Sequence, residues 1–458
     1  MFEVKQVILA VRQIAILNEF RPYAESRHMA ISTFNFWIFP RPLNVFLSLG
    51  LVLFFVSTHP VRAESTNKRM IIPGARAQAL SGAYTAVAAD ASAGWYNPAG
   101  LGFSKGPGVS VSVNNYSRSH KEVKGVSETT NLTENSSSIY PGFAGGHGTA
   151  GPFALGWSYF TTEQQNTDES QTFNVSSFDS LGTEANFRYD RTELTTGNLI
   201  HAGASIALAV GENLSIGVSE FYYRRQKQTS LKERSTYDSG VFYDSFARQS
   251  TENEGTIAVA GILLRTQNLS LGIALKSPTA LTDKTDYETS SVIFTGSTPE
   301  LSSTTSASHR EDELIVRTWS LGAAYTPCSW ALLSLDGLHY PATTTAWSDA
   351  GGFNTETVTD WSVGLELKSR SMLLAGGAFT NSSLVSTPKP SLIASGPAKI
   401  DYLGFSAGLG FRTSQSETML IMVRQRGKGQ TQMVQGSLTL QDVTIETQSF
   451  SLSSSYRF

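Results

Sequence analysis

Apolar residues alternate with small or polar residues over most of the chain beyond residue 107. The pattern is clearest in residues 269–276 (LSLGIALK), 361–368 (WSVGLELK) and 403–411 (LGFSAGLGF). Successive side chains of a β-strand point to opposite faces, so a period of two indicates strands with one apolar face and one small or polar face. The pattern therefore predicts an all-β fold for this part of the chain.

Strands of this kind are predicted at regular intervals up to the end of the chain. We count about fourteen of them, and short connections between neighbours indicate an antiparallel order. They lie near residues 107–116, 137–146, 153–161, 188–210, 214–228, 255–266, 269–280, 311–326, 330–345, 357–368, 371–380, 400–412, 417–427 and 443–458.

The connections between these strands alternate in length. Short turns and long segments rich in Ser, Thr, Asn, Asp and Glu follow one another with few exceptions. The short turns are residues 211–213, 267–268, 327–329 and 369–370, and the long segments are 117–136, 162–187, 229–254, 281–310 and 381–399. A soluble β-sandwich shows the same hydrophobic period but gives no reason for sorted connections. Short turns at one end and long polar loops at the other are typical of an outer-membrane β-barrel.

A secretory signal peptide is predicted near the N-terminus. Residues 43–57 (LNVFLSLGLVLFFVS) form an apolar run that is followed by a small-residue pattern ending at Ala63, which is the arrangement of an export signal. The run is shorter than the roughly 20 residues of a membrane-spanning helix. We therefore assign residues 1–63 to an export signal cleaved after Ala63, with translation starting at Met29, and we expect the outer membrane of a Gram-negative type cell as the destination.

Residues 74–102 (GARAQALSGAYTAVAADASAGWYNPAGLG) are unusually rich in Gly, Ala and Ser. Small residues let a backbone pack closely against another part of the protein. The segment ends in Asn97-Pro98-Ala99-Gly100, where the proline fixes its own backbone and holds Asn97 out of the helical region. A rigid turn is therefore predicted at this end, and an amphipathic helix with a tight stop is the alternative that composition leaves open.

This segment resembles the N-terminal hatch of the FadL-type outer-membrane transporters, a family of β-barrels that import long-chain fatty acids and other hydrophobic compounds. Residues 275–278 (LKSP), residues 319–330 (WSLGAAYTPCSW) and the final SSYRF are similar to further elements of that family. The resemblance implies a transmembrane barrel of residues 107–458 whose lumen is plugged by a hatch of residues 64–106. A proline common before the middle hairpin is missing here, and an Asp/Arg pattern is reduced to Asp401.

The resemblance also implies a function. It implies passive uptake of long-chain fatty acids or other hydrophobic small molecules, which are caught among the outer loops, enter an apolar pocket and leave sideways through the wall or past a shifted hatch. The residues assigned to the hatch are Gly74, Asp90, Asn97, Pro98, Ala99 and Gly100. Asn97 and Pro98 are the predicted pivot, and Asp90 is either a polar contact to the wall or, as its position favours, a turn residue.

The wall predicted to face the hatch is lined by small residues. These are Ser270, Gly272, Gly364, Gly404, Gly408 and Gly410. In the fifth strand the apolar phase changes from Leu214, Ile216 and Val218 to Phe221 and Tyr223, which predicts a β-bulge. The sequence does not identify the residues that line the ligand pocket.

The last predicted strand carries apolar and aromatic residues on one face, and the chain ends on an aromatic residue. Such terminal aromatics resemble the sequence by which barrel proteins are recognised for outer-membrane assembly. The residues concerned are Phe450, Leu452, Tyr456 and Phe458. The barrel assembly machinery and outer-membrane lipid are therefore expected partners, together with a hydrophobic small-molecule ligand.

Composition and charge exclude several other classes. The net charge of −3 and the pI near 6.2 provide no basic field for nucleic acid. A hydrophobic content of 40% and a mean hydropathy of −0.13 are too polar for a helical membrane protein but suit a barrel with one apolar face. Cys328 is the single cysteine, and the seven histidines are scattered without metal-ligand spacing. We therefore expect no disulfide, metal or cofactor.

Two other functions fit parts of the sequence. Barrels with the same opening motif also hold or shuttle secreted proteins, and the polar character of residues 117–136 and 229–254 favours such a partner-holding role over capture of fatty acids. An enzyme would need serine, histidine and carboxylate together at the outer rim. His309 beside Glu311 and Asp312 is the nearest arrangement and has no marked nucleophile, so we expect no enzymatic activity.

Overall fold

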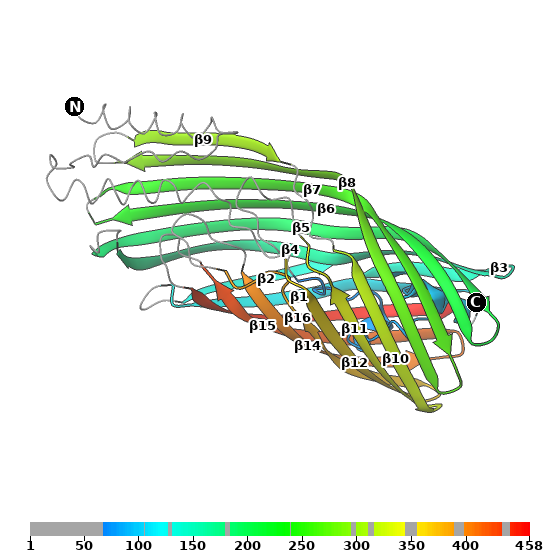
Figure 1. Ribbon diagram of the computed structural model, residues 1–458. Helices are drawn as coiled ribbons and strands as arrows, with labels where there is room; N and C mark the ends of the chain where they lie inside the picture. The colour runs from blue at the N-terminus through cyan, green and yellow to red at the C-terminus, as the bar shows by residue number, and fades with distance from the viewer. Residues whose placement is uncertain are drawn as a thin grey trace, which may run out of the picture. The chain divides into compact units, whose positions relative to one another are not determined.

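The computed structural model describes residues 67–104, 106–126, 131–178, 184–238, 240–294, 299–309, 316–343, 355–388, 398–432 and 440–458. The predicted export signal, its start at Met29, and Glu311 and Asp312 lie outside these residues. The described chain is a β-barrel around a short N-terminal segment (Figure 1). None of the helices in these ranges has the length and apolar character needed to cross a membrane.

Among the described residues, sixteen strands form one antiparallel sheet. The strands are β1 (Gly108–Lys124), β2 (Leu132–Tyr140), β3 (Phe143–Ala150), β4 (Phe153–Phe178), β5 (Glu184–Val210), β6 (Leu214–Tyr237), β7 (Phe242–Arg265), β8 (Leu269–Phe294), β9 (Pro299–His309), β10 (Thr318–Cys328), β11 (Ala331–Tyr340), β12 (Val358–Lys368), β13 (Met372–Asn381), β14 (Lys399–Arg412), β15 (Ser416–Thr431) and β16 (Gln441–Arg457).

Fourteen of these strands close into the barrel, which confirms the predicted fold. Neighbours pair in order from β3 to β8 and from β10 to β16, while β1 joins β16 to β3. The ring closes between β8 and β10, where Leu269 to Lys276 pair with Tyr325 to Thr318. The other two strands, β2 and β9, pair with the outer halves of β1 and β8 beyond this ring.

The strand predicted at residues 137–146 is two strands. β2 ends at Tyr140 and β3 begins at Phe143. Pro141 has no N–H to donate to a neighbouring strand, and Gly142 packs so closely against Asn115 that a Cβ there would lie 2.5 Å from the Asn115 Nδ2 atom. The break lets β1 pair with β3 near the turns and with β2 further out.

A belt of apolar side chains covers the outer face of the barrel. Leu333 and Leu335 of β11 and Trp361, Val363 and Leu365 of β12 are between 43% and 56% exposed, whereas the alternate residues of these strands face inward. Apolar side chains outside and small or polar ones inside are the arrangement of a transmembrane barrel. The barrel is therefore of the outer-membrane type.

Most of the residues predicted as long polar loops are strand instead. β4 to β8 each have 24 to 27 residues and project far beyond the short turns (Figure 1). In these outer halves both faces of each strand carry polar residues. Hydropathy therefore does not alternate along them, although the backbone is extended. β6 keeps alternating buried and exposed side chains to its end. The prediction therefore placed the long side of the barrel correctly and ended its strands too early.

The β-bulge predicted in the fifth strand is wrong. That strand, β6, pairs with β5 and β7 without a shift of register. Ile216 and Val218 are 44% and 54% exposed on the outer face, whereas Phe221 and Tyr223 are buried on the inner face. The change of apolar phase marks the height at which the apolar side of this strand changes from the membrane to the lumen.

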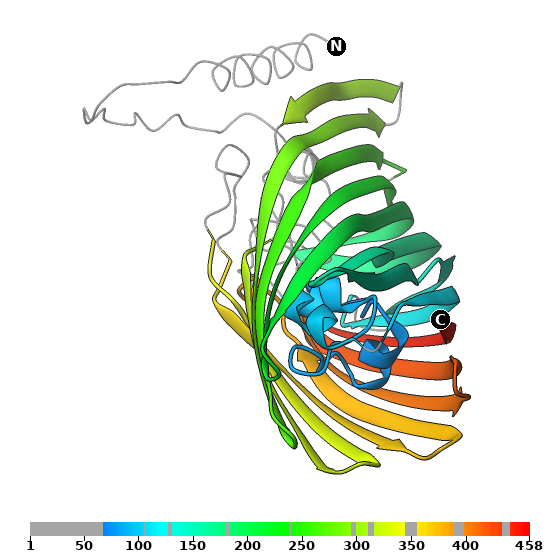
Figure 2. The ribbon, with the colours of Figure 1, turned by 90° about the vertical axis from the view of Figure 1, so that its right-hand side faces the viewer.

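The N-terminal segment lies inside the barrel, where Figure 2 shows it in blue surrounded by strands. This segment, residues 67–104, is called the plug below. It contains the helices α3 (Ala75–Ala79), α4 (Ala93–Tyr96) and η1 (Pro98–Phe103), joined by turns. Its small residues thus form short helices and close turns rather than the single amphipathic helix considered from composition.

An arginine in the belt should destabilise the barrel. In Leu335→Arg the charge would face lipid, which costs about 2–4 kcal/mol of unfolding free energy near the centre of a transmembrane barrel. Leu194→Arg is the matched control, because Leu194 is similarly exposed, at 44% against 49%, but lies on the outer extension of β5. Urea unfolding from phospholipid vesicles measures both variants. Equal losses would contradict the position of the belt.

Candidate functional site

The plug contacts the wall at positions where the wall has glycine. A Cβ added at Gly261 or Gly272 would lie 2.0 Å from Asn97 Oδ1 or 2.4 Å from the carbonyl oxygen of Thr85. Five further glycines of the wall contact the plug in the same way, namely Gly217, Gly322, Gly364, Gly377 and Gly408. The prediction that small wall residues admit the plug is confirmed for Gly272, Gly364 and Gly408. Gly404 packs against Phe379, and Gly410 against Leu373 and Met419, which are wall residues.

Asn97 joins two parts of the plug to the wall. Its side chain is fully buried, and Nδ2 donates to the carbonyl oxygens of Thr85 and of Ile262 in β7, each at 3.0 Å. Oδ1 accepts a bond from the Ala99 N–H at 3.2 Å and so caps η1, in which Pro98 is the first residue. The Asn-Pro pair therefore ends α4, begins η1 and fixes both to β7.

Two predicted glycines serve packing within the plug. Gly74 precedes α3 with a φ of 87°, and a Cβ there would lie 2.7 Å from the Cβ of Ser92. At Gly100 a Cβ would lie only 1.9 Å from the carbonyl oxygen of Ala88. Only glycine fits either position without moving the neighbouring chain.

Asp90 forms a turn within the plug. Its carboxylate accepts bonds from the Tyr84 hydroxyl at 2.6 Å and from the N–H and hydroxyl of Ser92 at 2.9 and 2.6 Å. A side chain that bonds the backbone two residues further on is a turn motif. Of the two roles considered from the sequence, the structure thus shows the turn.

A buried carboxylate of the wall holds one turn of the plug. Asp336 of β11 is 1% exposed, and its Oδ2 accepts bonds from the N–H groups of Tyr84 and Thr85 at 2.8 and 2.7 Å. Hydrogen bonds to an ionised acceptor are among the stronger ones in proteins. This single side chain therefore fixes residues 84–87, called the partition turn below, to the wall.

An ion pair fixes α3 to β12. Arg76 Nε lies 2.6 Å from Glu366 Oε2, and Arg76 Nη2 lies 3.1 Å from Oε1, so the pair is bidentate. The Glu366 side chain is buried. A second guanidinium, Arg69, donates to the hydroxyl of Ser362 on the same strand at 2.7 Å. Removing one partner of a buried pair leaves the other charge uncompensated, so these contacts hold the plug in one position.

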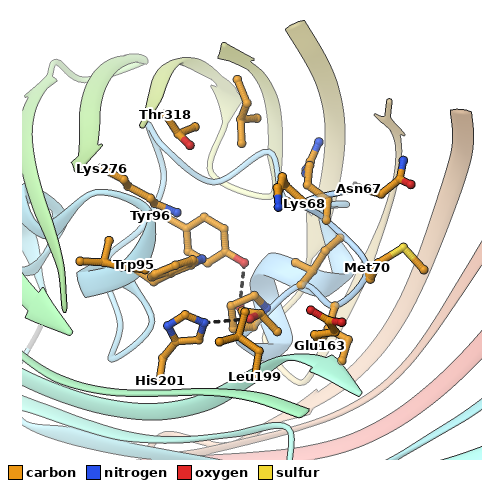
Figure 3. Close-up of a pocket in the computed structure, with 18 of the residues that line it drawn as sticks. Asn67, Lys68, Met70, Trp95, Tyr96, Glu163, Leu199, His201, Lys276 and Thr318 are labelled. Atoms are coloured by element: carbon orange, nitrogen blue, oxygen red, sulfur yellow. Dashed lines mark hydrogen bonds between the residues drawn. The ribbon is translucent and has the colours of Figure 1, made fainter. Parts of the chain in front are cut away.

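A cavity of about 190 Å³ lies between the plug and the wall, on the side of the plug away from the short turns (Figure 3). A cavity of about 150 Å³ with apolar walls is enough to bind benzene. Apolar and aromatic residues line this cavity beside polar and charged ones, among them Arg69, Glu163, Arg225 and Asp336. Ile72, Pro73, Trp95 and Tyr96 belong to the plug, and Leu199, Ile257, Pro278, Val316, Leu338, Tyr340 and Tyr402 to the wall.

Trp95 is held between wall residues at this cavity (Figure 3). The Lys276 Nζ atom lies 3.7 Å from its ring centroid, and the ring centroids of Phe160 and His201 lie 5.0 Å away. His201 Nε2 is 2.8 Å from Thr162 Oγ1, and Thr162 lies at a register shift between β4 and β5. The bulge at Thr162 thus positions the histidine beside Trp95.

Lys276 lines this cavity and faces two aromatic rings. Besides Trp95 it lies 5.7 Å from the ring of Tyr96, and within the described ranges no carboxylate forms an ion pair with it. An ammonium over an aromatic face is stabilised by about 0.5–2 kcal/mol. The cavity therefore combines apolar surface with cations at its border, Lys276 beside Lys68, Arg69 and Arg225.

A second cavity, of about 390 Å³, lies on the other side of the plug beside the short turn at residues 266–268. Charged residues of the wall line it, among them Arg265, Lys368, Arg412 and Glu417. The plug is one chain thick between the two cavities, because Pro73 and Thr85 line the first and their neighbours Gly74 and Ala86 line the second. The partition turn thus separates the two cavities.

The outer extensions carry apolar residues on their inner face. Leu132, Phe173, Phe187 and Tyr237 belong to a buried cluster that also includes Tyr402 of β14. The outer extensions, predicted to be polar in residues 117–136 and 229–254, therefore gather their few apolar residues on one side in the fold, and whether this side captures hydrophobic ligands stays a prediction.

Ionic groups lie next to this cluster. Arg191 of β5 is 6% exposed and pairs with Glu193 and with Glu134 of β2. Burial raises the pKa of the Glu233 carboxyl, although the guanidinium of Arg191 opposes this shift. Charged residues therefore join β2, β5 and β6 on the inside of the extension.

The predicted assembly residues lie on the outer face of β16. Phe450, Leu452 and Tyr456 are 42%, 52% and 40% exposed, and Phe458 at the end of the chain is 72% exposed. Their common face is thus as predicted, and it is part of the apolar belt. Recognition by assembly machinery stays a prediction.

Three charged residues of the site were not predicted. Asp336, Glu366 and Lys276 each interrupt an otherwise apolar and small-residue strand at an inward position. The signal that could have identified them is a single charged residue at one of the alternate strand positions that otherwise carry small residues and face the lumen. A charge that faces the lumen needs a partner there. The sequence does not reveal which partner it meets.

The fold and this interior define a class of protein: a fourteen-stranded outer-membrane barrel whose lumen contains an N-terminal plug beside an apolar cavity. No protein-family model matches the chain, and no curated protein matches it.

Solved structures share this fold. A FadL homologue of Pseudomonas aeruginosa is 14% identical with a TM-score of 0.59, over 86% of this chain and 100% of that one. The toluene transporter TodX of P. putida is 12% identical with a TM-score of 0.57, over 85% and 99%. The toluene transporter TbuX of Ralstonia pickettii is 13% identical with a TM-score of 0.53, over 85% and 99%. The fold is thus that of the FadL-type transporters, as the hatch motif indicated.

Asp336→Ala should loosen the partition turn. Two buried N–H groups would lose their acceptor, and each unsatisfied group costs about 1–3 kcal/mol. Hydrogen exchange of the Tyr84 and Thr85 amides should therefore become at least about tenfold faster. Asp360→Ala is the control, because Asp360 of β12 is equally buried but accepts bonds from Thr380 and Ser382 of the wall. Unchanged exchange in Asp336→Ala would contradict the anchoring role.

Proposed function

We propose that this protein mediates passive uptake of hydrophobic small molecules, long-chain fatty acids among them, across the outer membrane. The observation that carries the proposal is the cavity of about 190 Å³ between plug and barrel, in which Trp95, Leu199, Ile257 and further apolar side chains offer a surface for a hydrophobic ligand. Binding sites for small molecules are typically apolar clefts with few polar groups. Burial of a ligand is favourable by about 0.8 kcal/mol per methylene, so capture needs no energy source.

The structural neighbours support this proposal. One is a FadL homologue, and two are toluene transporters by name. They share the fold at low identity, and toluene, which two of the names give as the transported compound, is hydrophobic. The apolar cluster inside the outer extension, with Phe173 and Phe187 among its members, would form the beginning of a path toward the cavity.

Lys276 supports carboxylates as part of the ligand range. Its ammonium borders the apolar cavity and has aromatic rings as its close partners. A carboxylate beside it would form a charge-assisted hydrogen bond, while the alkyl or aromatic body of the ligand lay against Trp95. A neutral ligand such as toluene would use only the apolar part of the cavity.

The first test is uptake of radiolabelled oleate and of radiolabelled toluene by cells that lack their own transporter and produce this chain. Saturable uptake of either compound above that of cells without the protein supports the proposal. No uptake of either compound by a correctly inserted barrel, recognised by heat-modifiable migration in gels, would contradict it and favour the role of holding or shuttling secreted proteins.

The substitution Lys276→Met should distinguish ligands that carry a carboxylate, such as oleate, from neutral ligands, such as toluene. Methionine keeps the length and apolar stem of lysine but removes its charge. Oleate uptake at subsaturating concentration should fall about tenfold, which corresponds to one charge-assisted contact of about 1.4 kcal/mol, and toluene uptake should stay within about twofold. Lys284→Met is the matched control, since Lys284 of the same strand is exposed and pairs with Asp286. An equal loss for both ligands would contradict a headgroup role for Lys276.

The exit of the ligand is proposed to pass the plug at the partition turn. This turn is the thinnest barrier between the two cavities, and Asn97 and Asp336 hold it. Its displacement would connect the apolar cavity with the cavity beside the short turns. Asn97 and Pro98, which fix the following helices to β7, would be the pivot.

A disulfide across the partition tests this route. In a Cys328→Ser background, Thr85→Cys and Gly322→Cys place two Cβ atoms 2.8 Å apart, so a shift of about 1 Å gives disulfide geometry. Uptake should fall at least about tenfold when the disulfide forms, because the crosslinked turn no longer opens and few molecules stay competent for transport. Uptake should return when a reductant breaks the disulfide.

The matched control ties a different part of the plug. Ala79→Cys and Gly408→Cys place their Cβ atoms 2.7 Å apart and join α3 to β14 without touching the partition turn. This variant should transport normally in its oxidised form. Full uptake through the variant crosslinked at Thr85 would exclude the route through the plug and favour lateral exit through the wall.

A further inference from the structure

The register of three neighbouring strands arranges outward side chains in rows at the outer border of the apolar belt. Pairing of β1 with β16 and of β16 with β15 aligns Tyr116, Phe450 and Met422 in one row. All three side chains are between 41% and 42% exposed. An aromatic row at the end of an apolar belt marks the level of the lipid headgroups in transmembrane barrels.

The next row outward is cationic. It consists of Arg118, Gln448 and Arg424, which lie two residues further along each strand, or about 7 Å at the rise of a β-strand. All three side chains belong to the exposed face. Two guanidinium groups therefore flank one neutral amide directly above the aromatic row.

Charged residues of both signs occupy the next two rows. His120, Glu446 and Arg426 form the first of them, and Glu122, Thr444 and Lys428 the second. Along β15 the outward residues thus read Leu420, Met422, Arg424, Arg426 and Lys428, an abrupt change from apolar to positively charged side chains.

Acidic groups compensate only part of this charge. Glu446 is shared by Arg424 at 3.1 Å and Arg426 at 3.4 Å. Glu122 lies 3.8 Å from Lys124, which pairs across the strands with Asp442. Arg424 and Arg426 stay 52% and 58% exposed. Lys428 lies opposite Asp401 of β14. The group of Arg118, Arg424 and Arg426, called the cationic patch below, has Glu446 as its carboxylate and thus keeps a positive surplus that faces outward.

Another part of the wall, β6, carries an outward arginine whose charge is compensated. Arg224 of β6 faces outward there, but two carboxylates surround it, with Glu252 at 2.6 Å and Glu254 at 3.1 Å. The arginine is therefore fully compensated by its own neighbours.

We propose that the cationic patch binds the phosphate groups of phosphorylated lipids in the outer leaflet. The patch begins where the lipid-facing belt ends, so acyl chains packed against Leu420, Leu452 and Phe450 bring an anionic headgroup to the level of Arg118 and Arg424. A planar guanidinium donates two parallel bonds to phosphate oxygens. The lipid contact is thus specific on this side of the barrel and independent of the transported ligand.

The test measures lipid binding to the purified full-length barrel in a neutral detergent. The probes are bisphosphorylated lipid A, the same lipid A after removal of its phosphates, and inorganic phosphate, each with chelator present to remove divalent ions. Native mass spectrometry should show at least about tenfold more complex with the phosphorylated lipid than with the dephosphorylated one. The preference should decline as salt rises from 50 to 500 mM, because exposed charges are screened.

The test variant is Arg118→Gln, Arg424→Gln and Arg426→Gln together, which should abolish the preference for phosphorylated lipid A. The control neutralises three exposed arginines of the outer extension, Arg188→Gln, Arg234→Gln and Arg248→Gln, and should keep it. Heat-modifiable migration checks that both variants are folded. Equal binding of the two lipids to the native protein, an equal loss in the control, or inorganic phosphate competing as well as lipid A would overturn the proposal.

Discussion

Lipid offers no hydrogen-bond partners, so every backbone N–H and C=O of the belt must be paired within the sheet. This constraint explains why the ring closes between β8 and β10 rather than between strands that follow one another in sequence. β9 interrupts the order, but it pairs with β8 only from Thr285 outward, beyond the closing contact. β2 is likewise displaced to the outer half of β1. Irregular pairing is thus found where water can satisfy the backbone, and regular pairing where lipid surrounds the wall.

A closed ring of fourteen strands leaves a lumen that its own side chains do not fill. The plug fills it, and the inner face of the wall determines how. Glycines let the plug approach the wall, while Asp336, Glu366 and Ser362 bind its backbone and its arginines. These polar anchors come from β11 and β12. On the side of β4 to β6 the contacts are aromatic instead, around Trp95. Trp95 and the anchoring residues Arg69 and Asp336 line the same cavity, so it is bounded both by rings and by charges.

The sequence predicted the belt because lipid requires an uninterrupted apolar face, and residues 361–368 show that face directly. The plug was predicted from the resemblance of residues 74–102 to the hatch of the FadL-type transporters, whereas composition and the Asn-Pro stop alone predicted only close packing and a rigid turn. The sequence-based prediction failed for the outer extensions, where both faces of a strand are wetted and hydropathy no longer alternates. It failed for β6 because one strand can turn its apolar side first to lipid and then to the lumen, as Val218 and Phe221 do. The partner of a buried charge such as Asp336 depends on how the plug folds, which local pattern does not contain.

The size of the cavity limits how tightly a ligand is held. About 190 Å³ accommodates roughly one ring or six carbon atoms, and six buried carbons at about 0.8 kcal/mol each give about 5 kcal/mol. That free energy corresponds to dissociation constants of the order of 0.1 to 1 mM. A longer chain would have to extend beyond the cavity, toward the outer cluster around Phe173. Weak binding suits passive uptake, because a site must release its ligand as readily as it takes it up. The cavity is therefore better suited to passage than to storage.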